Sequence, residues 1–338
     1  MNDLSAALAR ALPCLALALT ACTAPTATPT ETFDALWTDF DELYGGFAIR
    51  DIDWDDSYAR YRPLVDDGTT DDELFAVLTD MLGETDDGHV HLTAPGRLHW
   101  TASRFRRDLV GYDRFDPALV RDGYLGGDFR TDFEDSYTLG TLASGHTYLG
   151  LAWVSDQMPI LRDVRPLAEA SGGLVIDLRH NSGGDFTWAL EALSDWRGAP
   201  APAFRSRTRN GPGRGDFTPW FEWSVGGAGP DLGVPIVVLI DRYTISAGER
   251  TVLALATFDD VTFIGEPTSG AIATAVGREL VNGWYVSIAT QEVLSPDGST
   301  IEGVGYTPDE VVINDPEVMA AGVDEVLERA MELLEQTP

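Results

Sequence analysis

Ser246 stands where the sequence predicts a strand, a tight turn and a helix in succession. Residues 235–240 before it are apolar, and the residues from Ala247 onward are typical of a helix. The first N–H groups of a helix lack helical partners, and the helix dipole favours negative charge there. About sixty residues earlier, a second apolar run at 173–176 leads into a turn with Gly183 and Gly184. A serine beside such backbone N–H groups is the arrangement that acyl transfer requires, so these residues predict a hydrolase.

Four segments carry a resemblance to a known family. They are 87–89 (Asp-Gly-His), 173–184 (Gly-Leu-Val-Ile-Asp-Leu-Arg-His-Asn-Ser-Gly-Gly), 246–249 (Ser-Ala-Gly-Glu) with 265–268 (Gly-Glu-Pro-Thr), and 301–309 (Ile-Glu-Gly-Val-Gly-Tyr-Thr-Pro-Asp). In this order they resemble the tail-specific, or C-terminal-processing, serine peptidases, over roughly residues 75–315. The resemblance implies a mixed α/β fold with a crotonase-like core of ββα units. Only 54 residues separate Leu92 from Thr147, too few for the complete PDZ module that one branch carries.

The resemblance also implies a set of catalytic roles. In one branch of the family a lysine activates the serine, and in a branch resembling the tricorn protease core a histidine does so. The chain has no lysine, and a serine hydroxyl is a poor nucleophile without a base. The resemblance therefore makes Ser246 the nucleophile and His89 the general base, which later protonates the leaving amine. Glu302 matches the acid that helps to orient the base in the tricorn-like branch, whereas Gly88 stands where that branch has a serine.

The oxyanion of the tetrahedral intermediate needs N–H donors near the nucleophile. We expect these to be the backbone N–H groups of Ala247 and of Gly183 or Gly184; in comparable sites, the loss of one donor costs ~3–4 kcal/mol. Three charged residues near the two turns are expected to be structural rather than catalytic: Asp177, Arg179 and Glu249.

Each catalytic assignment has a plainer structural alternative. Ser246 could serve only as a helix N-cap, and Glu302 could lie in a turn at the end of a strand. His180, in the glycine turn, is the second candidate for the base. His89 and His91 share one face of a predicted strand at 89–92, which raises the question of a metal site. We find no third ligand at suitable spacing, so we expect no metal and no cofactor.

The charge and the aromatic residues bear on the class of function. The formal net charge of −32 argues against nucleic-acid binding, which requires a basic face. A second hypothesis is a non-proteolytic protein that binds apolar ligands on the same scaffold, as the retinoid-binding modules that resemble this core do. The aromatic residues Trp220, Phe221 and Trp223 would suit such a ligand. A third hypothesis, a crotonase-type acyl-CoA enzyme, would place the protein in the cytoplasm.

The amino terminus predicts export and lipid anchoring. Residues 1–21 contain one arginine and an apolar stretch too short to span a bilayer, which is typical of a signal peptide. The segment Leu-Thr-Ala-Cys at 19–22 resembles a lipobox, which would make Cys22 the lipidated first residue and 22–30 a tether. We therefore expect a membrane attachment through Cys22, outside the cytoplasm, and a peptide or protein substrate. The signal argues against the acyl-CoA hypothesis.

The remaining chain divides into two predicted parts. Residues 31–95 form a helical subdomain that contributes His89, because apolar residues recur there at helical spacing. Residues 96–338 form the peptidase core, in which 199–233, rich in glycine, proline and aromatic residues, reads as a long lid-like loop. Asn282 and Gly283 lie between two alternating runs and predict a β-hairpin.

Overall fold

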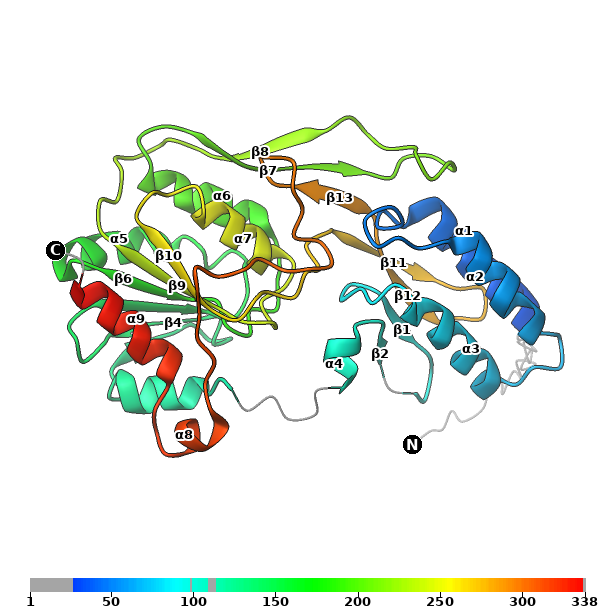
Figure 1. The fold of residues 1–338 in the computed structure, drawn as a ribbon, viewed down its shortest axis with the longest axis horizontal. Coiled ribbons are helices and arrows are strands. Elements are labelled where there is room, and N and C mark those ends of the chain that lie inside the picture. Colours follow the sequence, from blue (N-terminus) through cyan, green and yellow to red (C-terminus); the bar gives the residue numbers. More distant parts are fainter. Residues whose placement is uncertain (1–26, 98, 109–113, 337–338) are drawn as a thin grey trace, which may run out of the picture.

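The computed structural model describes residues 27–97, 99–108 and 114–336. The predicted signal peptide and Cys22 lie outside these residues. No helix in the described part of the chain is both long and apolar enough to cross a bilayer. Two lobes lie side by side, and a three-stranded sheet runs along the top of both (Figure 1). The mixed α/β class predicted from the sequence is confirmed.

The N-terminal lobe is built from three helices that pack on a four-stranded sheet. The helices are α1 (Pro29–Leu43), α2 (Trp54–Tyr61) and α3 (Asp71–Gly83). The sheet has the order β11 (Ala275–Glu279), β12 (Tyr285–Ala289), β1 (His91–Thr93) and β2 (Trp100–Thr101), and a short helix follows, α4 (Arg104–Asp108). Capping boxes start α1 and α3, at Thr28 with Glu31 and at Thr70 with Glu73. The aromatic stripe of α1 is buried in the core of this lobe.

The boundary predicted at residue 95 does not separate the two lobes. The hairpin β11–β12, which Asn282 and Gly283 predicted, belongs to the C-terminal part of the sequence, yet β12 pairs with β1. Trp284, Val286 and Ile288 are buried in the same cluster as the residues of α1 and α3. The physical reason is that β1 has only three residues and needs longer strands beside it to form a sheet.

The core lobe contains a seven-stranded sheet. Its strands, in spatial order, are β14 (Glu310–Val311), β10 (Val261–Gly265), β9 (Ile236–Ile240), β6 (Leu174–Asp177), β5 (Thr147–Leu151), β4 (Tyr137–Thr141) and β3 (Phe129–Arg130). The strands from β14 to β5 are parallel, and β4 and β3 are antiparallel. The carboxyl ends of β6 and β9 therefore meet at one edge, where ligands of such sheets usually bind.

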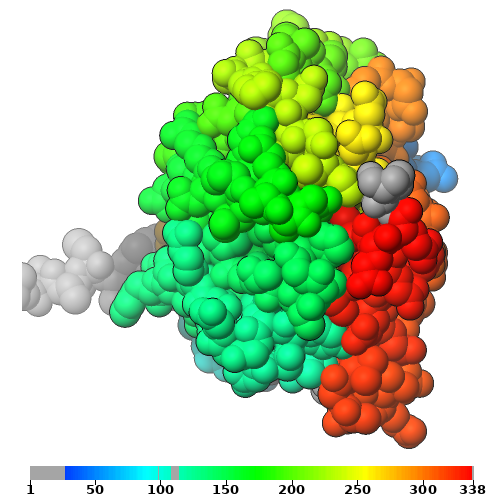
Figure 2. All heavy atoms as spheres, turned by 90° about the vertical axis from the view of Figure 1, so that its left-hand side faces the viewer, coloured from blue at the N-terminus to red at the C-terminus, as the bar shows by residue number. Residues whose placement is uncertain are grey.

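Helices cover both faces of this sheet. Along β9, Ile236, Val238 and Ile240 pack toward α5 (Ile160–Ser171), α6 (Phe186–Leu193) and α7 (Ala247–Leu255). The alternate residues Val237 and Leu239 pack toward α9 (Glu325–Gln336) on the other face. Both faces of a parallel sheet are buried in this way, which explains the continuous apolar runs in the sequence. Figure 2 shows α9 and the short α8 (Pro316–Ala320) along one flank of the core lobe.

The sequence predicted a long loop at residues 199–233, and this prediction is wrong. They contain β7 (Ala201–Thr208) and β8 (Phe221–Val225), which form the third sheet with β13 (Gln291–Leu294). Trp223 packs edge-on against Phe186 of α6, and Arg207 lies over the rings of Phe217 and Trp220. Arginines at the alternate positions 205, 207 and 209 obscured the strand pattern in the sequence, although their side chains stack on aromatic rings across the hairpin.

Candidate active site

Ser246 occupies a strained turn at the carboxyl end of β9. It is the N-cap of α7, with φ 60° and ψ −119°, in a region that costs a residue other than glycine of order 1–3 kcal/mol. Its N–H group donates to Ala271 O at 3.0 Å and lies 3.3 Å from Oε2 of Glu249. Two contacts of the Ser246 N–H group therefore stabilise this strained conformation, and such conformations are common at functional sites.

Glu249 fastens this turn to the neighbouring segment. Its buried carboxylate accepts hydrogen bonds from Thr268 Oγ1 at 2.6 Å and from the N–H groups of Gly270 and Ala271 at 2.7 and 3.0 Å. Burial raises the pKa of Glu249, and these hydrogen bonds lower it. With the Ser246 N–H group, Glu249 has four hydrogen-bond donors around it, which explains how a carboxylate is accommodated at this depth. The contacts agree with the structural role expected for Glu249.

The glycine turn after β6 lies directly against Ser246. A β-carbon on Gly183 would come within 2.8 Å of Ser246 Cβ, and one on Gly184 within 2.0 Å of Val154 O, so neither position has room for a side chain. Both glycines also have positive φ, at 93° and 130°. The Gly183 N–H group donates to Asn181 Oδ1 at 3.0 Å. Among the described residues, the N–H groups of Gly184 and Ala247 donate to no other group.

His89 lies in a turn just before β1, rather than inside a strand as predicted. A β-carbon on the preceding Gly88 would come within 3.0 Å of Ala271 Cβ and 3.1 Å of Ile245 Cδ1. A side chain at position 88 would therefore require these neighbours to move by a few tenths of an ångström, and glycine avoids this crowding. The His89 N–H group donates to Asp87 Oδ1 at 2.8 Å. The structure thus brings the histidine segment against the residue that precedes the serine.

The environment of His89 favours its neutral form. The pKa of His89 is lowered to about 4, mainly by burial; Asp87 raises it, and Arg250, His91 and Arg106 contribute to the lowering. The imidazole Nδ1 is buried without a hydrogen-bond partner in the described part of the chain, and no hydrogen bond joins the imidazole to Ser246. A neutral imidazole is the form that accepts a proton from a hydroxyl.

Glu302 takes part in a buried network beneath the histidine turn. One carboxylate oxygen pairs with Arg50, and the other accepts from the N–H groups of Ile272 and Ala273, both at 3.1 Å. Arg50 also donates to Asp86 O at 2.9 Å and to Gly270 O at 3.0 Å. Burial raises the pKa of Glu302, and Arg50 opposes this rise.

Asp87 links this network to His89. Its Oδ2 accepts from the Tyr44 hydroxyl at 3.0 Å and lies 3.6 Å from Arg50 Nε. Within the described residues, Glu302 makes no hydrogen bond to His89; Arg50 and Asp87 stand between the two. The sequence singled out the segment 87–89 but gave Asp87 no role, and it gave no sign of Tyr44 or Arg50 in the site. Arg50 lies 252 positions from Glu302, and no local pattern marks it.

His180, the second candidate for the base, lies on the side of the glycine turn that faces Tyr243. Its Nε2 is 3.3 Å from Asp241 Oδ2, and its ring packs against Phe115 and Tyr243. It therefore has a carboxylate partner, which His89 lacks at its Nδ1. Burial lowers the pKa of His180 and raises that of Asp241.

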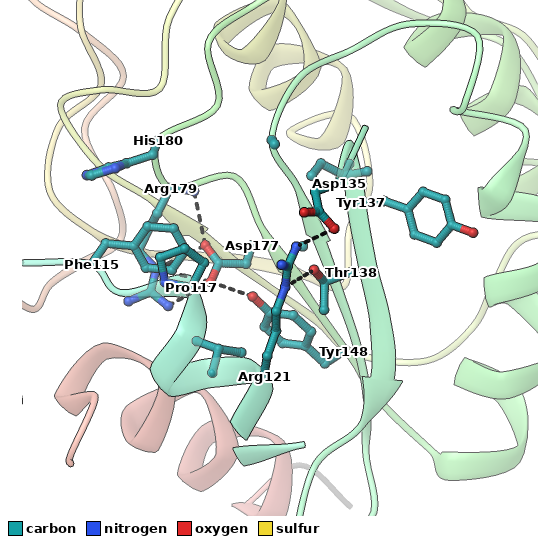
Figure 3. A pocket seen from close by; sticks show the side chains of 14 residues that line it. Phe115, Pro117, Arg121, Asp135, Tyr137, Thr138, Tyr148, Asp177, Arg179 and His180 are labelled. Atoms are coloured by element: carbon teal, nitrogen blue, oxygen red, sulfur yellow. Dashed lines mark hydrogen bonds and ion pairs between the residues drawn. The ribbon is translucent and has the colours of Figure 1, made fainter. Parts of the chain in front are cut away.

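A cavity of about 310 Å³ adjoins the glycine turn at the ends of β5 and β6 (Figure 3). Its wall is formed mainly by apolar and aromatic groups, among them Phe115, Tyr137 and Tyr148. Below it, Arg179 pairs with Asp177 at 2.6 Å and with Asp324, just before α9, at 2.8 Å. These contacts agree with the expected structural role of Arg179 and Asp177. In the described residues, no group of three or more His, Cys, Asp or Glu side chains is arranged to hold a metal ion.

Comparisons with known proteins agree on the type of protein. Residues 158–312 match the model of peptidase family S41, and residues 25–83 match that of the tricorn protease C1 domain. A chloroplastic C-terminal processing peptidase of Tetradesmus obliquus is 31% identical over 163 residues. That match covers 46% of this chain and 31% of the peptidase, so the chain corresponds to about a third of that relative.

Solved structures extend the likeness to most of the fold. A crystal structure of a candidate peptidase from Parabacteroides merdae is 28% identical, with a TM-score of 0.80 over 92% of this chain and 98% of that one. The photosystem II D1 C-terminal processing protease has a TM-score of 0.54 at 17% identity, with the same coverage. The second of these shows a similar fold only.

Proposed function

We propose that the chain, which matches peptidase family S41 over residues 158–312 and the tricorn protease C1 domain over residues 25–83, hydrolyses peptide bonds through an acyl-enzyme on Ser246, with His89 as the general base. The observation that carries the proposal is the meeting of three distant segments. The glycine turn and the histidine turn both pack against the strained turn of Ser246. A protein that only bound apolar ligands would not need this convergence.

The proposed reaction begins with the neutral imidazole. His89 takes the proton of the Ser246 hydroxyl as Oγ attacks the carbonyl carbon of the substrate. The oxyanion that forms is stabilised by the N–H groups of Ala247 and Gly184, or of Gly183 once it releases Asn181. The C–N bond then breaks as His89 gives its proton to the leaving amine. Water, deprotonated by His89, finally releases the acyl group.

Glu302 is proposed as a positioning residue in this reaction. It acts on His89 through Arg50 and Asp87, because its own hydrogen bonds go to Arg50 and to the 272–273 backbone. The conformation of the histidine turn then depends on a carboxylate far along the chain. This role replaces the relay through a serine, because position 88 is a glycine, and a β-carbon there would crowd Ala271 and Ile245.

A fluorophosphonate probe tests the nucleophile and the base. We expect the wild type to be labelled and Ser246→Ala to remain unlabelled. His89→Ala should lower the labelling rate by about 10²–10⁴-fold, the usual contribution of a general base. His180→Ala is the matched control and should keep the rate within a few-fold. The opposite result for the two histidine variants would assign the base to His180, and an unlabelled wild type would refute the peptidase.

We further propose that the protein is lipid-anchored at Cys22, outside the cytoplasm. The support is the lipobox-like segment at 19–22, which lies outside the described residues. Two or three acyl chains hold a protein at a membrane, since each buried CH₂ contributes ~0.8 kcal/mol. In a bacterial host fed an alkyne fatty acid, the wild type should be labelled and sediment with membranes. Cys22→Ser should be neither labelled nor sedimented, whereas Cys14→Ser should behave as the wild type does.

A further inference from the structure

Arg106 is an arginine with few partners at the seam between the lobes. It lies on α4, and its Nη2 donates to Tyr243 O at 3.4 Å, three residues before Ser246. Its guanidinium carbon is 5.5 Å from the centre of the Tyr243 ring. Its Nε is buried without an acceptor, and no carboxylate in the described part of the chain lies within ion-pair distance. The side chain thus crosses from the N-terminal lobe to the turn that carries the nucleophile.

Other buried arginines without an ion pair have a clear structural role, which Arg106 lacks. Arg209 donates to the carbonyl groups of four residues and joins β7 to α1. Arg250 donates to Ile272 O at 3.0 Å and to Gln291 at 2.7 Å, and it packs on the ring of Phe186. Arg106 has a single long hydrogen bond. Its position is therefore not explained by the contacts that hold the fold together.

The charge balance of the protein makes this cation more unusual. The chain has 55 acidic residues and 23 arginines, so carboxylates are abundant, yet none of those whose side chains the structure describes pairs with Arg106. A cation removed from water without a counter-ion is unfavourable, and burial lowers the pKa of Arg106. The pKa values of His89 and His91 are lowered mainly by burial, and the charge of Arg106 lowers both of them further. Its positive charge thus lies beside the proposed catalytic imidazole.

We propose that Arg106 binds a carboxylate of the substrate close to the scissile bond, so that the enzyme favours peptides with an acidic group there. The Nη1 group makes no hydrogen bond to the described residues and, unlike Nε, is not a buried atom. Arginine forms strong, charge-assisted hydrogen bonds with carboxylates. The carboxylate comes from an Asp or Glu side chain or from the free C-terminus of the peptide. This inference rests on the proposed peptidase function.

Paired peptides test the inference. Cleavage sites are first mapped by mass spectrometry on denatured casein, and the best-cleaved sequence is then made with Glu or Gln at each position flanking the cut. Each peptide is also made with a free and with an amidated C-terminus. We expect kcat/KM to be about ten- to hundredfold higher for the acidic member of one pair, as for a charge-assisted hydrogen bond. The pair that shows the difference identifies the source of the carboxylate.

Variants on α4 separate recognition from folding. Arg106→Gln should bring the ratio of kcat/KM between the acidic and the neutral peptide of the pair to about one, while fluorophosphonate still labels Ser246. Arg106→Glu should reverse the preference toward the matching Lys peptide, a gain that misfolding cannot produce. Arg104→Gln, which removes the same charge from an exposed position on the same helix, should keep the preference. A labelled wild type with equal rates for all pairs would overturn the inference alone, whereas an unlabelled wild type would overturn both proposals.

Discussion

The buried pair of Arg50 and Glu302 allows a quantitative prediction about how the two lobes are held together. Their side chains are 9% and 4% exposed, and Glu302 also accepts two backbone N–H groups. Glu302→Gln keeps an oxygen for those groups but removes the charge that compensates Arg50. Breaking a buried ion pair costs ~3–5 kcal/mol. Asp87, 3.6 Å from Arg50 Nε, retains part of the compensation, so we expect about 3 kcal/mol.

The assay is urea unfolding followed by tryptophan fluorescence, since stabilities of about 5–15 kcal/mol leave this loss measurable. The double variant Arg50→Met with Glu302→Gln removes both members of the pair, so its cost should fall about 1–3 kcal/mol below the sum of the single costs. A Glu302→Gln cost below ~1 kcal/mol, or additivity within ~0.5 kcal/mol, would refute the pairing. Folded Glu302→Gln should lose less than tenfold in labelling rate. A loss equal to that of His89→Ala would instead indicate direct contact between Glu302 and the base.

Three further predictions concern the site itself. Only neutral imidazole accepts a proton, and the pKa of His89 is lowered to about 4, so the labelling rate should be constant from pH 8 to 5 and halve near pH 4. A midpoint near 6.5, with the circular dichroism spectrum unchanged, would contradict the burial of His89. Gly88→Ser should slow labelling about 10²-fold, because its β-carbon would push Ala271 aside. The control Gly215→Ser, whose β-carbon would meet nothing within 4 Å, should leave the rate unchanged. Equal rates for the two variants would count against tight packing at the seam. Gly184→Ala should abolish soluble expression or labelling, because its β-carbon would overlap a backbone carbonyl, and a fully active variant would show that the turn is arranged differently.

The residues predicted from the sequence are those whose surroundings are local. Ser246 and the glycine turn follow strands whose apolar runs are visible in the sequence, and the turn geometry follows from Gly183 and Gly184 themselves. The hairpin at Asn282 was predicted for the same reason. Each of these signals extends over a few residues.

The residues that sequence reasoning missed depend on partners far along the chain. Arg50 pairs with a residue 252 positions away, and Arg106 reaches one 137 positions away. Neither side chain stands in a motif, so only the fold shows what each contacts. The same cause explains the misplaced lobe boundary, because the pairing of β12 with β1 is set by packing against the N-terminal helices and not by the hairpin sequence.

The segment between Gly270 and Glu302 is what makes one site from two lobes. Gly270 O accepts from Arg50 of the N-terminal lobe, and Ala271 O accepts from the N–H group of Ser246 in the core lobe. The chain then continues into β11 and β12, which complete the sheet of the histidine lobe, and returns to Glu302. Separating the lobes would therefore break the ion pair of Arg50 with Glu302 or the hydrogen bond from Ser246 to Ala271 O. One segment thus contacts both the histidine turn, through Arg50, and the serine turn, through its own backbone, and so joins the two halves of the proposed site.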